Sequence, residues 1–111
     1  MTQPYKSEAE IEAVVRGFEN CTTDKEAFSH REHLTVAVWY IQHHPDRALE
    51  KMRSGLLRFL SHHRVDAGKY REDVTVAWMD LTSKTLAELQ PGMSLLEATN
   101  AVVERLRKSM L

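Results

Sequence analysis

The residues with the clearest chemical potential are two histidines, His30 and His33, in a segment of helical periodicity. Residues three positions apart lie on the same side of an α-helix. On a helical wheel His30 falls near the middle of a wide apolar arc and His33 toward its edge, so both rings are expected to be partly withdrawn from water. Imidazoles in such settings act as acids, bases or metal ligands. We predict His30 and His33 as catalytic residues.

A second helical segment, around residues 70–89, also carries polar side chains on its apolar face. Arg71, Thr75 and Thr82 project there on the wheel, and Trp78 follows Thr75 by three residues. A buried guanidinium needs partners, because an unpaired buried charge destabilises a fold strongly. The wheel therefore predicts that the polar ends of these two helices meet.

The polar residues of the two helices lie at the same height in the bundle if the helix between them runs antiparallel to both. Two helix N-termini and one arginine around a pocket would favour an anionic group there. We therefore predict a buried polar pocket that binds a small, anionic molecule. Beside the two histidines, its predicted ligand-binding residues are Tyr40, Arg71, Thr75 and Trp78.

The elements that position these residues are predicted to be helices throughout. Apolar residues recur at spacings of three and four, and the few glycines and prolines fall between these periodic segments. Capping boxes at Ser7–Glu10 and Ser94–Glu97 mark two helix starts. We expect an all-α, compact, mostly antiparallel bundle in a single domain over residues 1–111, with helices at about 7–20, 27–43, 46–63, 70–89 and 95–109.

Composition narrows the functional classes. The 111 residues are 42% apolar and have a formal net charge of −1, so no global charge attracts nucleic acid or an anionic membrane surface. No apolar run approaches the ~20 residues of a membrane span. Cys21 is the only cysteine, and the amino-terminal residues do not resemble a signal peptide. We therefore expect a soluble, cytoplasmic protein that binds neither nucleic acid nor membrane.

Two motifs carry a resemblance to a family. The first is Phe28-x-His30-x-x-His33-Leu34, and the second is Lys69-Tyr70-x-Glu72-x-x-Thr75-x-x-Trp78. Together they resemble a family of short, uncharacterised bacterial all-helical proteins with the patterns F-x-H-x-x-H-L and K-Y-H-x-T-x-T-x-x-W. The resemblance covers about residues 28–80 and implies the fold and the pairing of the motifs, with no activity attached. Arg71 stands where that pattern has a third histidine, and Asp73 where it has a threonine.

Three hypotheses of function remain open at this point. The first is a small-molecule-binding protein or cofactor-free enzyme, with His30 or His33 as the acid or base, Arg71 as the anion clamp and Thr75 as an orienting group. The second is a helical bundle that binds a transition metal through His30 and His33. The third is a homodimeric interaction module in which the polar cluster fixes helix register and Trp39 contacts the partner.

Overall fold

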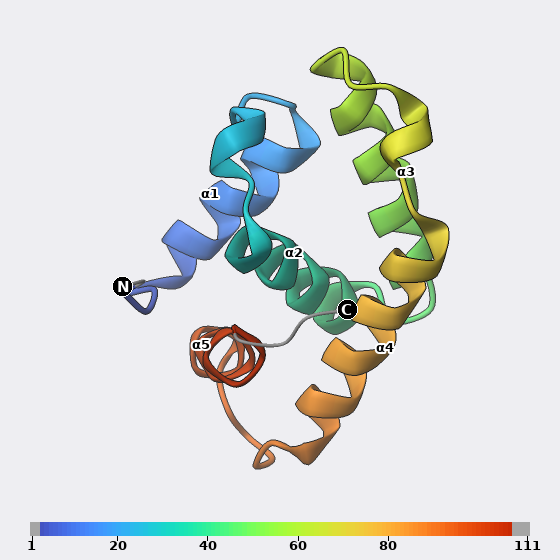
Figure 1. Cartoon of the computed structure of the whole chain (residues 1–111). Coiled ribbons are helices and arrows are strands. Elements are labelled where there is room, and N and C mark those ends of the chain that lie inside the picture. The colour runs from blue at the N-terminus through green and yellow to red at the C-terminus, as the bar shows by residue number, and fades with distance from the viewer. Residues whose placement is uncertain (1–2, 108–111) are drawn as a thin grey trace.

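The computed structural model describes residues 3–107 and contains five α-helices with two short 3₁₀ turns (Figure 1). No strand occurs within this range, so the predicted all-α class is confirmed. The predicted residues 108 and 109 of the last helix lie outside the described part. The elements in chain order are α1 (Glu8–Glu19), η1 (Lys25–Ala27), α2 (His30–His43), α3 (Ala48–His62), η2 (Ala67–Lys69), α4 (Glu72–Glu88) and α5 (Leu95–Leu106).

Helix α2 is the centre of the bundle and contacts each of the other four helices. In Figure 1 it lies between α1 and α5 on one side and the pair α3 and α4 on the other. The pair runs antiparallel, whereas α5 is seen end-on in the same view and therefore crosses the pair. A helix with neighbours all around it needs a wide apolar surface. This explains why the apolar arc of α2 is unusually broad.

The two helices that carry the predicted site residues, α2 and α4, begin in different ways. A reciprocal capping box starts α2, in which the Ser29 backbone N–H donates to Glu32 Oε1 at 2.9 Å. Helix α4 has no side-chain cap and begins at Glu72, two residues later than the sequence predicted. Tyr70 and Arg71 have extended backbone conformations before it. The side chain of Arg71 therefore does not follow the helical wheel on which its burial was predicted.

The core consists of two clusters on opposite sides of α2. The first is built around stacked aromatic rings, with 4.7 Å between the ring centroids of Phe18 and Phe28 and 5.1 Å between those of Phe28 and Phe59. The second is aliphatic and joins Leu34 of α2 to Val102 of α5. The first half of α2, which carries both predicted catalytic histidines, contributes side chains to both clusters.

None of the helices in the described residues combines the length and the hydrophobicity that a membrane span requires.

Candidate functional site

A cavity of about 190 Å³ lies between α2, α3 and α4. We call it the α2–α4 pocket. Most of its surface is apolar, and no Asp, Glu, Lys or Arg side chain lines it. Its polar side chains are those of the two predicted histidines, Thr75, Thr82 and the indole of Trp78. The lining residues are His30, His33, Leu34, Ala37, Met52, Leu56, Val74, Thr75, Trp78, Met79 and Thr82.

His33 presents an imidazole to the pocket in an apolar setting. Its ring lies 4.5 Å from the ring of Phe28, measured between centroids. Burial, and to a lesser extent the neighbouring His30, lower the pKa of His33 to about 4, while Glu32 acts in the opposite direction. No hydrogen bond to a described residue engages either ring nitrogen. His33 is therefore neutral at physiological pH, with one nitrogen that can accept and one that can donate.

His30 has a structural partner that His33 lacks. Its Nε2 atom lies 2.9 Å from the backbone carbonyl oxygen of Leu106, the last residue of α5. A carbonyl oxygen only accepts, so Nε2 carries the proton and donates to one of the carbonyls left open at a helix end. The ring also meets the edge of Trp78, at 4.6 Å between centroids. These contacts show that His30 ties α5 to α2 and α4.

The pocket-lining threonines of α4 differ in what their hydroxyls bind. Thr75 is buried, and its hydroxyl donates to the carbonyl oxygen of Arg71 at 3.0 Å. Thr82 is 0% exposed, and its hydroxyl has no hydrogen-bond partner among the described residues. Buried polar groups are nearly always paired in native proteins, so an exception needs an explanation. The Thr82 hydroxyl is therefore an unsatisfied buried group beside the pocket, out of reach of a water-sized molecule.

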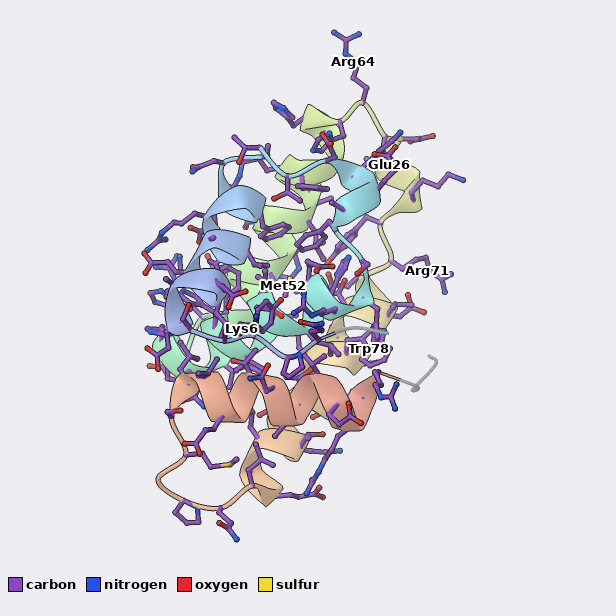
Figure 2. All side chains as sticks on the ribbon, turned by 90° about the vertical axis from the view of Figure 1, so that its left-hand side faces the viewer. Lys6, Glu26, Met52, Arg64, Arg71 and Trp78 are labelled. Carbon is purple, nitrogen blue, oxygen red and sulfur yellow. The ribbon has the colours of Figure 1, made fainter. Side chains whose placement is uncertain are left out.

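The predicted position of Arg71 is wrong. Its side chain is 66% exposed and forms a two-pronged ion pair with Asp73, at 2.9 Å between Nη2 and Oδ2 and 3.1 Å between Nε and Oδ1. Figure 2 shows Arg71 projecting from the edge of the molecule, whereas Met52 lies among the helices. The extended backbone before α4 turns the guanidinium outward. No cation is therefore present to hold an anion in the α2–α4 pocket.

The predicted place of Tyr40 in the wall of this pocket is also wrong. Tyr40 is buried in the aromatic cluster, and its hydroxyl donates to Glu19 Oε2 of α1 at 2.8 Å. Burial and the bond to Glu19 raise the pKa of the Tyr40 phenol well above its ordinary value. Tyr40 lies ten residues beyond His30, nearly three turns along α2, which brings it against α1 and α3 instead of α4. The structure therefore gathers His30, His33, Thr75 and Trp78, but not Tyr40 or Arg71.

The metal hypothesis needs a third ligand near His30 and His33. The described residues contain no group of three or more His, Cys, Asp or Glu side chains arranged to hold a metal ion. One nitrogen of His30 already contacts the Leu106 carbonyl. A pair of histidines without a further donor does not complete a tetrahedral site.

Trp39, predicted as an exposed partner contact, is half-buried. Its ring packs against the aromatic cluster and stacks on His43 at 4.1 Å between centroids, with the Arg16 guanidinium 5.8 Å away. These internal contacts account for a tryptophan on the outer side of α2. Part of the Trp39 side chain remains in solvent, and the homodimer hypothesis stays a prediction.

Sequence reasoning did not assign Thr82 or six apolar side chains to the site. The apolar ones are Leu34 and Ala37 of α2, Met52 and Leu56 of α3, and Val74 and Met79 of α4. The available signal was the apolar stripe of the α3 segment, which includes Met52 and Leu56. A stripe of that kind indicates a core-facing side and does not indicate which part of the core is hollow.

The fold and the site together define a small all-helical protein with an uncharged, largely apolar pocket. No family model matches the sequence, and neither a curated protein nor a solved structure is significantly similar to it. The resemblance to a family of bacterial helical proteins therefore stays a prediction. Any function has to be argued from the pocket itself.

Proposed function

We propose that this protein binds a small, neutral, largely apolar organic molecule in the α2–α4 pocket. The observation that carries the proposal is the unpartnered, neutral imidazole of His33 in a cavity with otherwise mostly apolar walls. Ligand sites are typically concave and apolar, with a few polar groups that fix the orientation of the ligand. An apolar cavity of about 150 Å³ already accepts a molecule of the size of benzene. The pocket has room for a substituted single ring.

A neutral ligand fits better than the anion expected from the sequence. The anion depended on Arg71, whose guanidinium is in solvent and paired with Asp73. A charged ligand would have to give up its hydration without finding an opposite charge, which costs several kcal/mol. A neutral molecule pays no such penalty and gains from burying its apolar surface.

The properties of His30 and His33 favour a role in binding over a role in acid–base catalysis. A general base works best with a pKa near the working pH, whereas the pKa of His33 lies at about 4. His30 holds a backbone carbonyl with its Nε2 atom. Because the pKa of His33 is far from that of a general base at neutral pH, and because Nε2 of His30 is engaged by a carbonyl, we propose a binding role for His33.

The proposal is tested by titrating the protein with p-xylene while the methionine methyl groups are followed by ¹³C NMR. Met52 and Met79 line the pocket and should shift, whereas Met93, in the α4–α5 connection, should not. A dissociation constant on the order of 1 mM or tighter is expected for a ligand of this size. Absence of any shift at Met52 and Met79 up to the solubility limit of p-xylene would contradict the proposal.

A matched pair of variants on α4 identifies the place of binding. Val74→Phe adds a ring to the wall of the pocket and should abolish the shifts. Val76→Phe adds the same ring on the same helix at a position that is 41% exposed, and it should leave binding unchanged. Equal binding by the two variants would show that p-xylene binds elsewhere.

A further inference from the structure

The polar side chains around the α2–α4 pocket differ in whether a ligand finds a free hydrogen-bonding atom on them. The Thr75 hydroxyl already donates to a backbone carbonyl, and the Thr82 hydroxyl is out of reach. Nε2 of His30 is engaged by the carbonyl oxygen of Leu106. The imidazole of His33 makes no hydrogen bond with a described residue, so both of its nitrogens are unused by the fold.

The nitrogens of His33 also retain accessible surface. Across residues 3–107, the side-chain nitrogens and oxygens that are both buried and unpartnered belong only to His63, Thr82 and Thr99. The nitrogens of His33 are unpartnered but do not belong to this group, so a water-sized molecule can touch them. His33 shares one side of α2 with His30 and Ala37, and all three residues line the α2–α4 pocket. The imidazole is therefore a polar group that a ligand in the pocket can reach.

We infer that a ring nitrogen of His33 binds a hydroxyl group of the ligand, and that the ligand is a neutral phenol or a similar single-ring alcohol. This inference rests on the proposed function and specifies its ligand class. In a neutral imidazole one nitrogen donates and the other accepts. A hydroxyl does both, so it can pair with either nitrogen, whereas a carbonyl or ether oxygen can pair only with the N–H.

A phenol meets the other demands of the site as well. The phenolic hydroxyl of tyrosine has a pKa of about 10, so a simple phenol is uncharged at physiological pH. This matters because no Asp, Glu, Lys or Arg side chain lines the pocket to compensate a charge. The aromatic ring of the ligand can pack against Met52 of α3 and Met79 of α4, which line the same pocket.

The energetic argument concerns the imidazole nitrogen that the ligand covers. A ligand without polar groups shields this nitrogen from water and offers nothing in return, which costs free energy. A hydroxyl on the ligand supplies the missing partner. The site should therefore discriminate between two ligands that differ in one polar group.

Isothermal titration with p-cresol and p-xylene tests the inference, since the two differ by a hydroxyl in place of a methyl group. The parent protein should bind p-cresol about fivefold more tightly, the ratio expected for one net hydrogen bond. His33→Leu removes both ring nitrogens and keeps the wall apolar. It should still bind p-xylene, but its preference for p-cresol should be lost or reversed, because the ligand hydroxyl then has no partner.

Trp78→Phe is the matched control within the pocket. The indole N–H of Trp78 makes no hydrogen bond with a described residue, and its substitution removes this donor from the pocket lining. The smaller ring should weaken the binding of both ligands alike and leave the fivefold ratio unchanged. Thermal denaturation checks that both variants fold.

A measurement on the parent protein is independent of how the variants fold. ¹⁵N NMR of the histidine side chains follows the two ring nitrogens of His33 directly. Binding of p-cresol should shift one of them strongly, because it enters a hydrogen bond, whereas p-xylene should shift both only weakly.

The outcomes separate the inference from the proposed function. Loss of the preference in His33→Leu but not in Trp78→Phe, with a strong nitrogen shift specific to p-cresol, supports the inference. Equal affinity of the parent protein for both ligands, a preference that survives in His33→Leu, or equal nitrogen shifts with both ligands overturns it. Binding of a neutral, apolar molecule in the pocket would still stand in these cases. Failure of the parent protein to bind either ligand overturns both.

Discussion

Adjacent residues of α3 meet two very different environments. A Cβ atom built on Gly55 would lie 2.5 Å from Cε2 of Phe18, so the aromatic cluster leaves no room there. The next residue, Leu56, lines the α2–α4 pocket. One hydroxyl on each side illustrates a further difference. On the aromatic side the Tyr40 hydroxyl donates to Glu19, whereas on the pocket side Thr82 has no partner among the described residues.

This contrast indicates that one side of the core stabilises the fold and the other side is built to bind a ligand. Close packing and paired polar groups stabilise the aromatic side, and a change there should cost free energy of unfolding. A cavity and unpaired polar groups give up stability on the pocket side, which is common where a protein binds a ligand. The same kind of substitution should therefore change the free energy of unfolding by different amounts on the two sides.

The largest expected effect is a pH dependence that originates on the pocket side. In the folded chain the pKa of His33 is about 4, below its ordinary 6.5. Between these values the unfolded chain binds more protons, so the free energy of unfolding should fall as the pH drops from about 6.5 to about 4. Above pH 6.5 this contribution is constant. We expect a loss of about 2–3 kcal/mol, measured by urea denaturation at a series of pH values.

Two glutamine variants isolate this contribution from that of other titrating groups. His33→Gln should show a flatter pH profile between pH 6.5 and 4 than the parent protein. His44→Gln replaces an exposed histidine just after α2 and should retain the parent profile. If His33→Gln keeps the parent profile, the imidazole of His33 is not withdrawn from water as described.

The second-largest expected effect on the free energy of unfolding is that of a change in packing. Gly55→Ala forces Phe18 to move and should lower the free energy of unfolding by about 1–2 kcal/mol. Ala37 belongs to the same core cluster but also lines the α2–α4 pocket. Ala37→Val therefore adds volume beside a cavity and should change the free energy of unfolding by less than about 1 kcal/mol. Urea denaturation of both variants measures the difference. Equal losses would mean that the pocket side is packed as tightly as the aromatic side.

The removal of one hydroxyl on each side should give the smallest effect. Tyr40→Phe deprives the carboxylate of Glu19 of a donor and should cost about 1 kcal/mol. Thr82→Val removes a hydroxyl that has no described partner and should leave stability unchanged or raise it slightly. Thermal denaturation compares the two directly. A larger loss for Thr82→Val than for Tyr40→Phe would contradict the proposed division.

Much of the fold was predictable because it depends on local signals. Apolar periodicity located all five α-helices, and the capping box at Ser94–Glu97 marks the start of α5 in the structure. The start of α4 was placed two residues too early, since nothing in the sequence signals that Tyr70 and Arg71 are extended. The orientation of α5 across the direction of α3 and α4 depends on contacts with distant residues of α1, α2 and α4, which periodicity does not contain.

The site was predictable only where side chains follow the helical wheel. His30, His33, Thr75 and Trp78 lie around one pocket as expected. Arg71 lies before the first turn of α4, where the wheel does not apply, and the anionic ligand was inferred from it. The hollow itself was not predictable, because a cavity reflects how side chains from three helices pack together.

A crystal structure of the protein grown with p-xylene tests the central claim most directly. The ring should lie between α2, α3 and α4, beside Met52 and Met79. This result would establish the α2–α4 pocket as a ligand site. A pocket closed by its own side chains, or p-xylene bound only at the surface, would contradict the account.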